Sequence, residues 1–89
     1  MGTGPQEDAW TVYGRVKTGL DVTGVVQFQG LHLDRVLSLD EANTFVEDAI
    51  TAYGEGAVEC VIVLLQGGRD SYGTRRVMRR VNNARAWWE

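Results

Sequence analysis

The 89-residue chain contains one cysteine, one proline and one histidine, and its nine basic residues include a single lysine. A lone cysteine, Cys60, excludes an internal disulfide and a cysteine-based zinc site, so the fold must depend on its hydrophobic core. The longest apolar run, Val61 to Leu65, is far shorter than the roughly 18–20 residues that cross a membrane. The first eight residues lack the basic and apolar segments of a secretory signal. These absences predict a cytoplasmic protein that does not contact membranes.

The composition that remains is that of a small globular protein. The chain is 44% hydrophobic and 24% charged, which is too apolar and too weakly charged overall for a fully disordered chain. Its length is enough for one domain and not for two. We predict a flexible N-terminal arm over residues 1–9 and one domain over residues 10–89.

The net charge of −3 conceals an uneven distribution. Residues 1–68 carry ten acids and three bases, whereas residues 69–86 carry six arginines and one aspartate. The chain is therefore an acidic body followed by a basic C-terminal segment, an asymmetry that is typical of an interaction surface.

The N-terminal third of the domain has the alternation of β-strands. Apolar and polar residues alternate from Trp10 to Thr18 and again from Val22 to Phe28, with a turn predicted at Gly19–Asp21. These two segments predict a β-hairpin. Leu31, Leu33 and Leu37 alternate with His32, Asp34 and Val36, which predicts a short third strand after a turn at Gln29–Gly30.

The clearest helix covers residues 39–53. Ser38 and Glu41 have the spacing of a capping box, in which the Ser38 hydroxyl accepts a hydrogen bond from the Glu41 amide. Gly54 is a suitable left-handed terminator. One apolar stripe runs along this segment at helical spacing and consists of Ala42, Phe45, Val46, Ala49, Ile50 and Tyr53.

The last third combines a buried strand with an ambiguous segment. Residues 57–66 are almost continuously apolar and rich in β-branched side chains, which predicts a central strand covered on both faces. Val77, Val81, Ala84 and Trp88 have helical spacing, so we expect residues 74–89 to form an Arg-rich helix; alternation over residues 75–81 is compatible with a strand instead. The expected fold is a small α+β domain of order β-β-(β)-α-β-α, an antiparallel sheet packed by both helices.

No motif has the spacing that catalysis or cofactor binding requires. His32 has no serine or cysteine partner that the sequence ties to it, and Cys60 lies in the most apolar segment, where burial raises a thiol pKa. Residues 68–73 have the glycine spacing of a phosphate-binding loop but lack its Lys and Ser/Thr. We therefore predict a protein without enzymatic activity, cofactor or metal.

Two functions are compatible with the charged and aromatic residues. The first is a small accessory or regulatory protein, such as a phage-encoded modulator of a host protein, which binds another protein or a second copy of itself. The second is a nucleic-acid-binding module, because arginines contact phosphates and aromatic rings stack on bases, although the sequence pI of about 5.0 opposes it. The candidate contact residues are Tyr72, Arg75, Arg76, Arg79, Arg80 and Trp87 in the basic segment, and Asp40, Glu47 and Asp48 on the solvent face of the helix.

Overall fold

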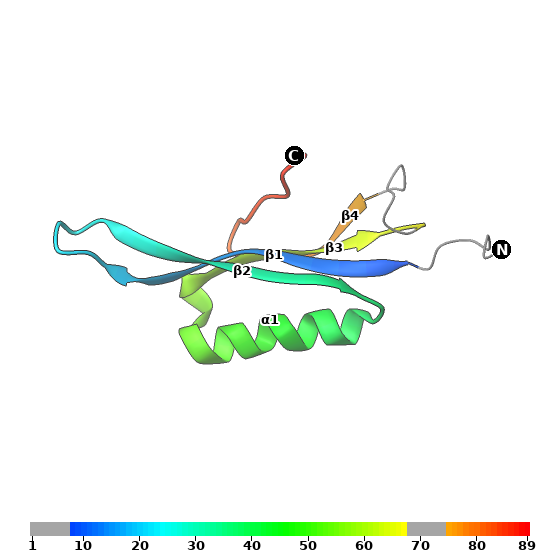
Figure 1. Cartoon of the computed structure of the whole chain (residues 1–89), viewed down its shortest axis with the longest axis horizontal. Helices are drawn as coiled ribbons and strands as arrows, with labels where there is room; N and C mark the ends of the chain where they lie inside the picture. Colours follow the sequence, from blue (N-terminus) through cyan, green and yellow to red (C-terminus); the bar gives the residue numbers. More distant parts are fainter. Residues whose placement is uncertain (1–7, 68–74) are drawn as a thin grey trace.

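The computed structural model describes residues 8–67 and 75–89 and contains a four-stranded antiparallel sheet and one α-helix (Figure 1). A short 3-10 turn, η1, joins the helix to the third strand. The elements in chain order are β1 (Ala9–Leu20), β2 (Val26–Val36), α1 (Leu39–Tyr53), η1 (Glu55–Ala57), β3 (Val58–Leu65) and β4 (Arg75–Val81). The predicted small α+β domain is confirmed at this level.

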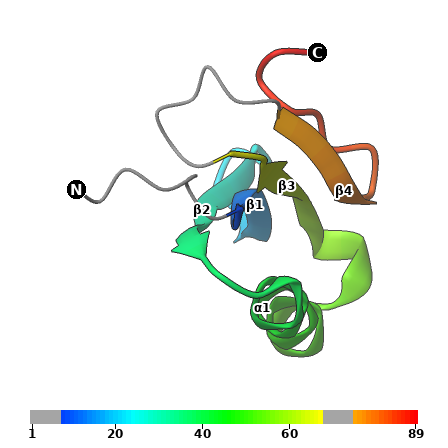
Figure 2. The same ribbon diagram turned by 90° about the vertical axis from the view of Figure 1, so that its right-hand side faces the viewer.

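The strands are ordered β2-β1-β3-β4, so β1 and β3 are internal and β2 and β4 form the two edges. Helix α1 covers one face of the sheet, and the C-terminal segment, residues 82–89, returns over the opposite face (Figure 2). The core lies between α1 and the sheet and includes Val12 and Val16 of β1, Val46 of α1 and Ile62 of β3. β3 is buried on both faces, as its continuous apolar sequence predicts.

Helix α1 begins and ends where the sequence predicts. The Ser38 hydroxyl accepts hydrogen bonds from the amides of Asp40, at 3.1 Å, and Glu41, at 3.4 Å. Gly54 ends the helix with a φ of 92°, in the region that only glycine adopts readily. Within the predicted apolar stripe, Ala42, Val46 and Ala49 are buried, Phe45 and Ile50 are partly buried against the core, and Tyr53 at the end of the helix is 45% exposed.

The predicted short third strand at Leu31–Leu37 is wrong, because residues 26–36 form one continuous strand. The chain does not turn at Gln29–Gly30; Gly30 pairs with Arg15 inside the β1–β2 ladder. The real turn lies later than predicted, between Leu20 and Val26. Glycine is compatible with an extended strand as well as with a turn, so the local signal could not distinguish the two.

The predicted C-terminal Arg-rich helix is also wrong, because residues 75–81 form the edge strand β4. A β-bulge lies between Val77 and Val81, so the two valines do not share a face as they would in a helix. Val63 pairs with Val77 and the preceding Ile62 pairs with Arg79, which leaves Met78 as the extra residue. The bulge places Val77 and Val81 on opposite faces of the sheet. Pairing with β4 also gives hydrogen-bond partners to the second edge of the buried strand β3.

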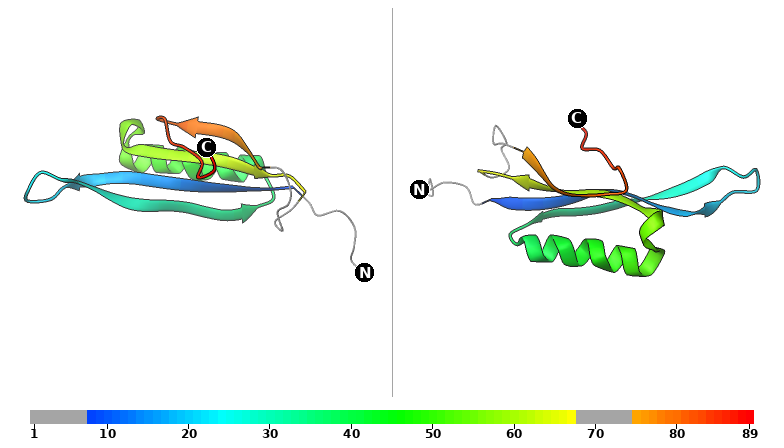
Figure 3. Two further views of the ribbon diagram at one scale, coloured as in Figure 1. Left: turned by 90° about the horizontal axis from the view of Figure 1, so that it is seen from above. Right: turned by 180° about the vertical axis from the view of Figure 1, so that it is seen from behind.

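Asn82 and Asn83 reverse the chain after β4. Both have left-handed backbone conformations, with φ values of 53° and 63°, which asparagine adopts more readily than most residues. The Asn82 side-chain amide donates to the carbonyl oxygen of Val58 at 2.9 Å, which fixes the reversal against β3. The C-terminal segment then lies on the sheet with Ala86 buried (Figure 3).

The predicted N-terminal arm falls largely outside the described residues, and β1 begins at Ala9. Within residues 8–67 and 75–89, no helix is both long and apolar enough to cross a membrane.

Candidate functional site

The β1–β2 hairpin extends well beyond the rest of the sheet. β1 stops pairing with β3 at Val16, opposite Val58, whereas its pairing with β2 continues to Leu20 and Val26. Residues 17–29 therefore form a two-stranded projection, which we call the hairpin extension; it lies at the left of Figure 1. α1 runs beneath the body of the sheet and does not reach the tip of this projection (Figures 1 and 3).

The hairpin extension exposes an unusual number of large apolar side chains. Leu20 pairs with Val26 and Lys17 pairs with Phe28, so Leu20, Val26 and Phe28 share one face of the ribbon. Leu20 is 68% exposed, and Val22 at the tip is fully exposed. The complete set of exposed apolar residues is Leu20, Val22, Val25, Val26 and Phe28. Large apolar side chains gathered on one projection mark an interaction site more often than singly scattered ones do.

The turn at the tip is tightly organised around Asp21. One oxygen of its carboxylate accepts hydrogen bonds from the Thr23 amide at 2.8 Å, the Thr23 hydroxyl at 2.7 Å and the Val25 amide at 2.9 Å. These bonds, led by that of the Thr23 side chain, hold the pKa of Asp21 below its ordinary value. Gly24 supplies the positive φ, 86°, that the turn requires. The turn therefore holds Val22 in a defined, exposed position.

Sequence reasoning misses this surface because alternation in a strand predicts that one face is buried. The available signal was the Asp21–Gly24 segment, in which an Asx turn and a glycine separate two apolar stretches. That pattern indicates a hairpin tip. It does not indicate whether the strands beyond the core have anything to cover their apolar face.

The basic residues do not form one continuous surface. Arg79 lies on the helix side of the sheet, where its guanidinium donates to the Asn43 side-chain oxygen at 3.0 Å and to the Glu47 carboxylate at 2.5 Å. Arg80 lies on the opposite side and donates to Glu89 at 2.8 Å and to the Ala84 carbonyl oxygen. Because β4 is a strand, its arginines are divided between two faces, and two of them already have acidic partners.

The Arg80–Glu89 pair attaches the end of the chain to the sheet. Hydrogen bonding with Arg80 is the main reason that the pKa of Glu89 falls from 4.5 to about 2, and the same bond raises the pKa of Arg80. The Glu89 carboxylate also accepts from the Ala86 amide at 3.1 Å. This carboxylate therefore fixes the C-terminal segment on the outward face of the sheet.

Trp87 is the more exposed of the two tryptophans in the C-terminal segment. It is 68% exposed, and its ring lies edge-on to that of Trp88, with 5.1 Å between centroids. The guanidinium of Arg75 lies 5.1 Å from the Trp87 ring centroid, within cation–π range. Trp88, which a helix would have buried, is 36% exposed. Arg76 is exposed, and Tyr72 lies outside the described residues.

The acidic candidates remain on α1 with different surroundings. Asp40 is exposed in the first turn, where the positive end of the helix dipole favours a carboxylate. Glu47 pairs with Arg79, so the acidic helix face does supply an internal partner for the basic segment. Asp48 is exposed.

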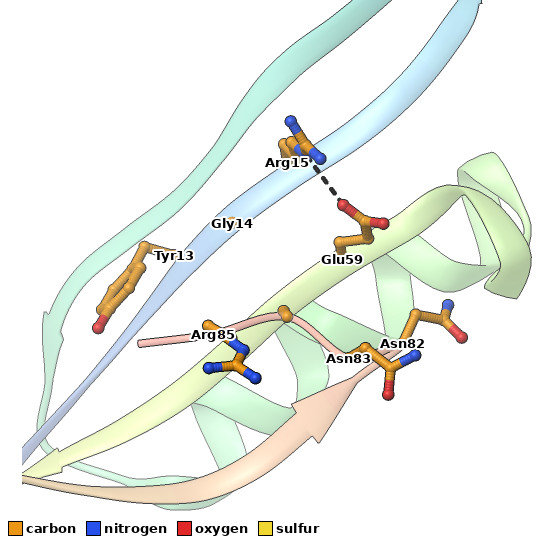
Figure 4. A pocket seen from close by; sticks show the side chains of 8 residues that line it. Tyr13, Gly14, Arg15, Glu59, Asn82, Asn83 and Arg85 are labelled. Carbon is orange, nitrogen blue, oxygen red and sulfur yellow. Dashed lines mark hydrogen bonds and ion pairs between the residues drawn. The ribbon is translucent and has the colours of Figure 1, made fainter. Parts of the chain in front are cut away.

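An open groove lies between the C-terminal segment and strands β1 and β3. Figure 4 shows the residues that line it: Tyr13, Gly14, Arg15, Glu59, Asn82, Asn83, Ala84 and Arg85. The Arg15 guanidinium and the Glu59 carboxylate form an ion pair with 2.8 Å between Nε and Oε1. Because these opposite charges neutralise each other, the remaining charge of the groove is that of Arg85, beside the hydrogen-bonding side chains of Asn82 and Asn83. The Arg15 guanidinium lies over the Phe28 ring, 3.8 Å from its centroid.

The two perturbed groups nearest the groove are explained by packing. Burial raises the pKa of the Tyr13 phenol, whose oxygen accepts a hydrogen bond from the Trp87 amide at 3.4 Å. Burial likewise raises the pKa of the Cys60 thiol, as its apolar sequence context predicts. In the part of the chain that the structure describes, no group of three acidic, histidine or cysteine residues is placed to hold a metal ion.

Comparison with known proteins adds no family: no family model, no curated protein and no solved structure matches the chain.

Proposed function

We propose that this chain is a small cytoplasmic accessory or regulatory protein that binds another protein through its hairpin extension. The main support for this proposal is the position of Val22. It is fully exposed at the tip of a turn that three hydrogen bonds to one Asp21 oxygen hold in place. A rigid apolar projection loses little conformational entropy on binding, which favours affinity. Leu20 and Phe28 extend the contact along one face of the ribbon.

The chemistry of the projection favours an apolar cleft of a protein as its partner. Lys17 and Asp21 are the only charged residues in the hairpin extension, and the Asp21 carboxylate is engaged in the turn. Nucleic acids and anionic membranes are bound through several cationic side chains, because affinity comes from neutralising phosphates. A projection with one lysine on a chain of net charge −3 provides little of that attraction.

The arrangement of the arginines also favours protein binding over nucleic-acid binding, the two functions that the sequence predicts. A nucleic-acid surface needs its cations on one face, and here Arg79 and Arg80 lie on opposite faces with carboxylate partners. The exposed Trp87 with Arg75 has the composition of a protein-binding hot spot and forms a second contact region in this proposal.

The proposal is tested by comparing the wild-type chain with Val22→Asp as baits in lysate from the source organism. Val22 touches no core residue, so Val22→Asp is expected to fold normally and to lose the captured protein, because a carboxylate cannot enter an apolar cleft without a large desolvation cost. Thr51→Asp, an exposed position on α1, adds the same charge away from the projection and serves as the matched control.

The protein that the wild type and Thr51→Asp retain is then purified and titrated by calorimetry. A loss of at least tenfold in affinity for Val22→Asp, with Thr51→Asp unchanged, supports the proposal. Equal affinity for all three chains rejects it. Retention of DNA, RNA or anionic vesicles that Arg76→Ala weakens and Val22→Asp leaves intact would favour the alternative function instead.

A further inference from the structure

β2 has a long uncharged segment, residues 26–33, and its two charged residues, Asp34 and Arg35, lie at the end of the strand, where Arg35 has a positive φ of 39°. β2 is the terminal strand of the sheet, so one side of its backbone has no partner strand among the described residues. From Phe28 to Leu33 its pairing with β1 has no bulge, and residues 26–33 contain no charged residue and no proline. Monomeric proteins normally interrupt such an edge with lysine, proline or a bulge, because its exposed amides and carbonyls recruit further strands.

The other edge of the same sheet has these protective features. β4 carries arginines at four of its seven positions, Arg75, Arg76, Arg79 and Arg80, and it is bulged at Met78. Two copies of this strand would place like charges opposite each other, which is destabilising. The contrast within one sheet shows that β2 is the edge suited to strand pairing.

We infer that β2 pairs antiparallel with β2 of a second copy, which joins two four-stranded sheets into one of eight strands. A second copy fits this edge because pairing about Gly30 places no charged residue of one copy opposite a charged residue of the other: Asp34 faces Val26 of the second chain. A twofold axis makes the contact the same for both copies, which is the commonest arrangement of soluble oligomers.

The register follows from the only glycine in β2. Gly30 lies near the middle of the uncharged segment, and a side chain built on it would meet nothing within 4 Å. Centring the axis there places Gly30 opposite its own copy and Phe28 opposite His32 of the second chain, an aromatic cross-strand pair. Both copies of α1 then lie on the same face of the joined sheet, because directly opposite residues share a face.

The first test measures the mass of the untagged chain by sedimentation equilibrium, without any partner protein. The wild type is expected at twice 9.9 kDa. Gly30→Lys is expected at the monomer mass, because it places two lysines opposite each other in a position with space for the side chain. Gly56→Lys, whose site is equally open but lies in η1, is the matched control and should remain dimeric.

The second test fixes the register by oxidation with diamide. Opposite Cα atoms of an antiparallel pair lie about 4.5–5.5 Å apart, within the roughly 4.4–6.8 Å that a disulfide spans. Gly30→Cys should therefore cross-link to a dimer at least tenfold faster than Gly56→Cys. A monomeric wild type overturns the inference, and so does a dimer that Gly30→Lys leaves intact. Neither measurement involves Val22, so the result is independent of the proposed function.

Discussion

Gly14 of β1 lies directly opposite Cys60 of β3, so close that a Cβ atom on Gly14 would be 2.5 Å from the Cys60 Cα and 2.6 Å from its Cβ. The Cys60 side chain occupies the space that residue 14 leaves, on the face of the sheet that α1 covers. A glycine at position 14 is therefore a packing requirement of the two internal strands.

Gly14→Ala should lower the free energy of unfolding by about 1–3 kcal/mol, because the added methyl group overpacks the contact between β1 and β3. Urea denaturation followed by circular dichroism measures the change. Gly30→Ala is the matched control in the same sheet and, with open space around it, should change stability by less than about 0.5 kcal/mol. Equal effects of the two substitutions would show that the close approach at Gly14 is not a constraint.

The Arg79–Glu47 ion pair between β4 and α1 should contribute little to stability. Both side chains are partly exposed, and exposed ion pairs typically contribute about 0.2–1 kcal/mol. A double-mutant cycle with Arg79→Ala and Glu47→Ala should give a coupling energy in that range, reduced by added salt. A parallel cycle of Arg79 with the exposed Asp48 should give no coupling energy. Coupling between Arg79 and Asp48 would indicate that Arg79 interacts with the overall negative charge of α1 and not specifically with Glu47.

Acid should release the C-terminal segment from the sheet. The pKa of Glu89 is lowered from 4.5 to about 2, so its ionised form stabilises the attachment above pH 4.5, and this contribution is lost as the pH falls from 4.5 toward 2. Tryptophan fluorescence of Trp87 and Trp88 should report the transition. Glu89→Gln should show altered fluorescence at neutral pH and no corresponding acid step; an unchanged step would assign it to another carboxylate.

The Cys60 thiol should resist modification while the chain is folded. It is buried beneath α1, so reagents do not reach it. Burial also raises its pKa, which lowers the fraction of the reactive thiolate. Reaction with Ellman's reagent at pH 8 should be at least tenfold slower in buffer than in urea. The exposed thiol of Gly56→Cys, away from the β2 edge, supplies the fast reference in the same folded chain, and a Cys60 rate equal to it would contradict the burial.

Agreement between sequence and structure is best where local and tertiary forces coincide. Helix α1 has its cap at Ser38, its terminator at Gly54 and one apolar stripe, so the same residues form the helix and pack it. The buried strand β3 was also predicted, because a continuous β-branched run must be covered on both faces.

The sequence by itself determined a small α+β chain, with its capped helix, its central buried strand and a hairpin before them. Strand order, the Met78 bulge and the placement of the arginines on two faces were decided only in the tertiary structure. The reason is that a spacing of four residues between Val77 and Val81 suits one face of a helix and also one face of a regular strand. Only the backbone of β3, which requires a partner on its second edge, distinguishes the two. The hairpin extension was likewise decided by the tertiary structure. Alternation in the sequence predicts that each strand has two different faces. How far either face is covered depends on where β3 stops pairing with β1, at Val58.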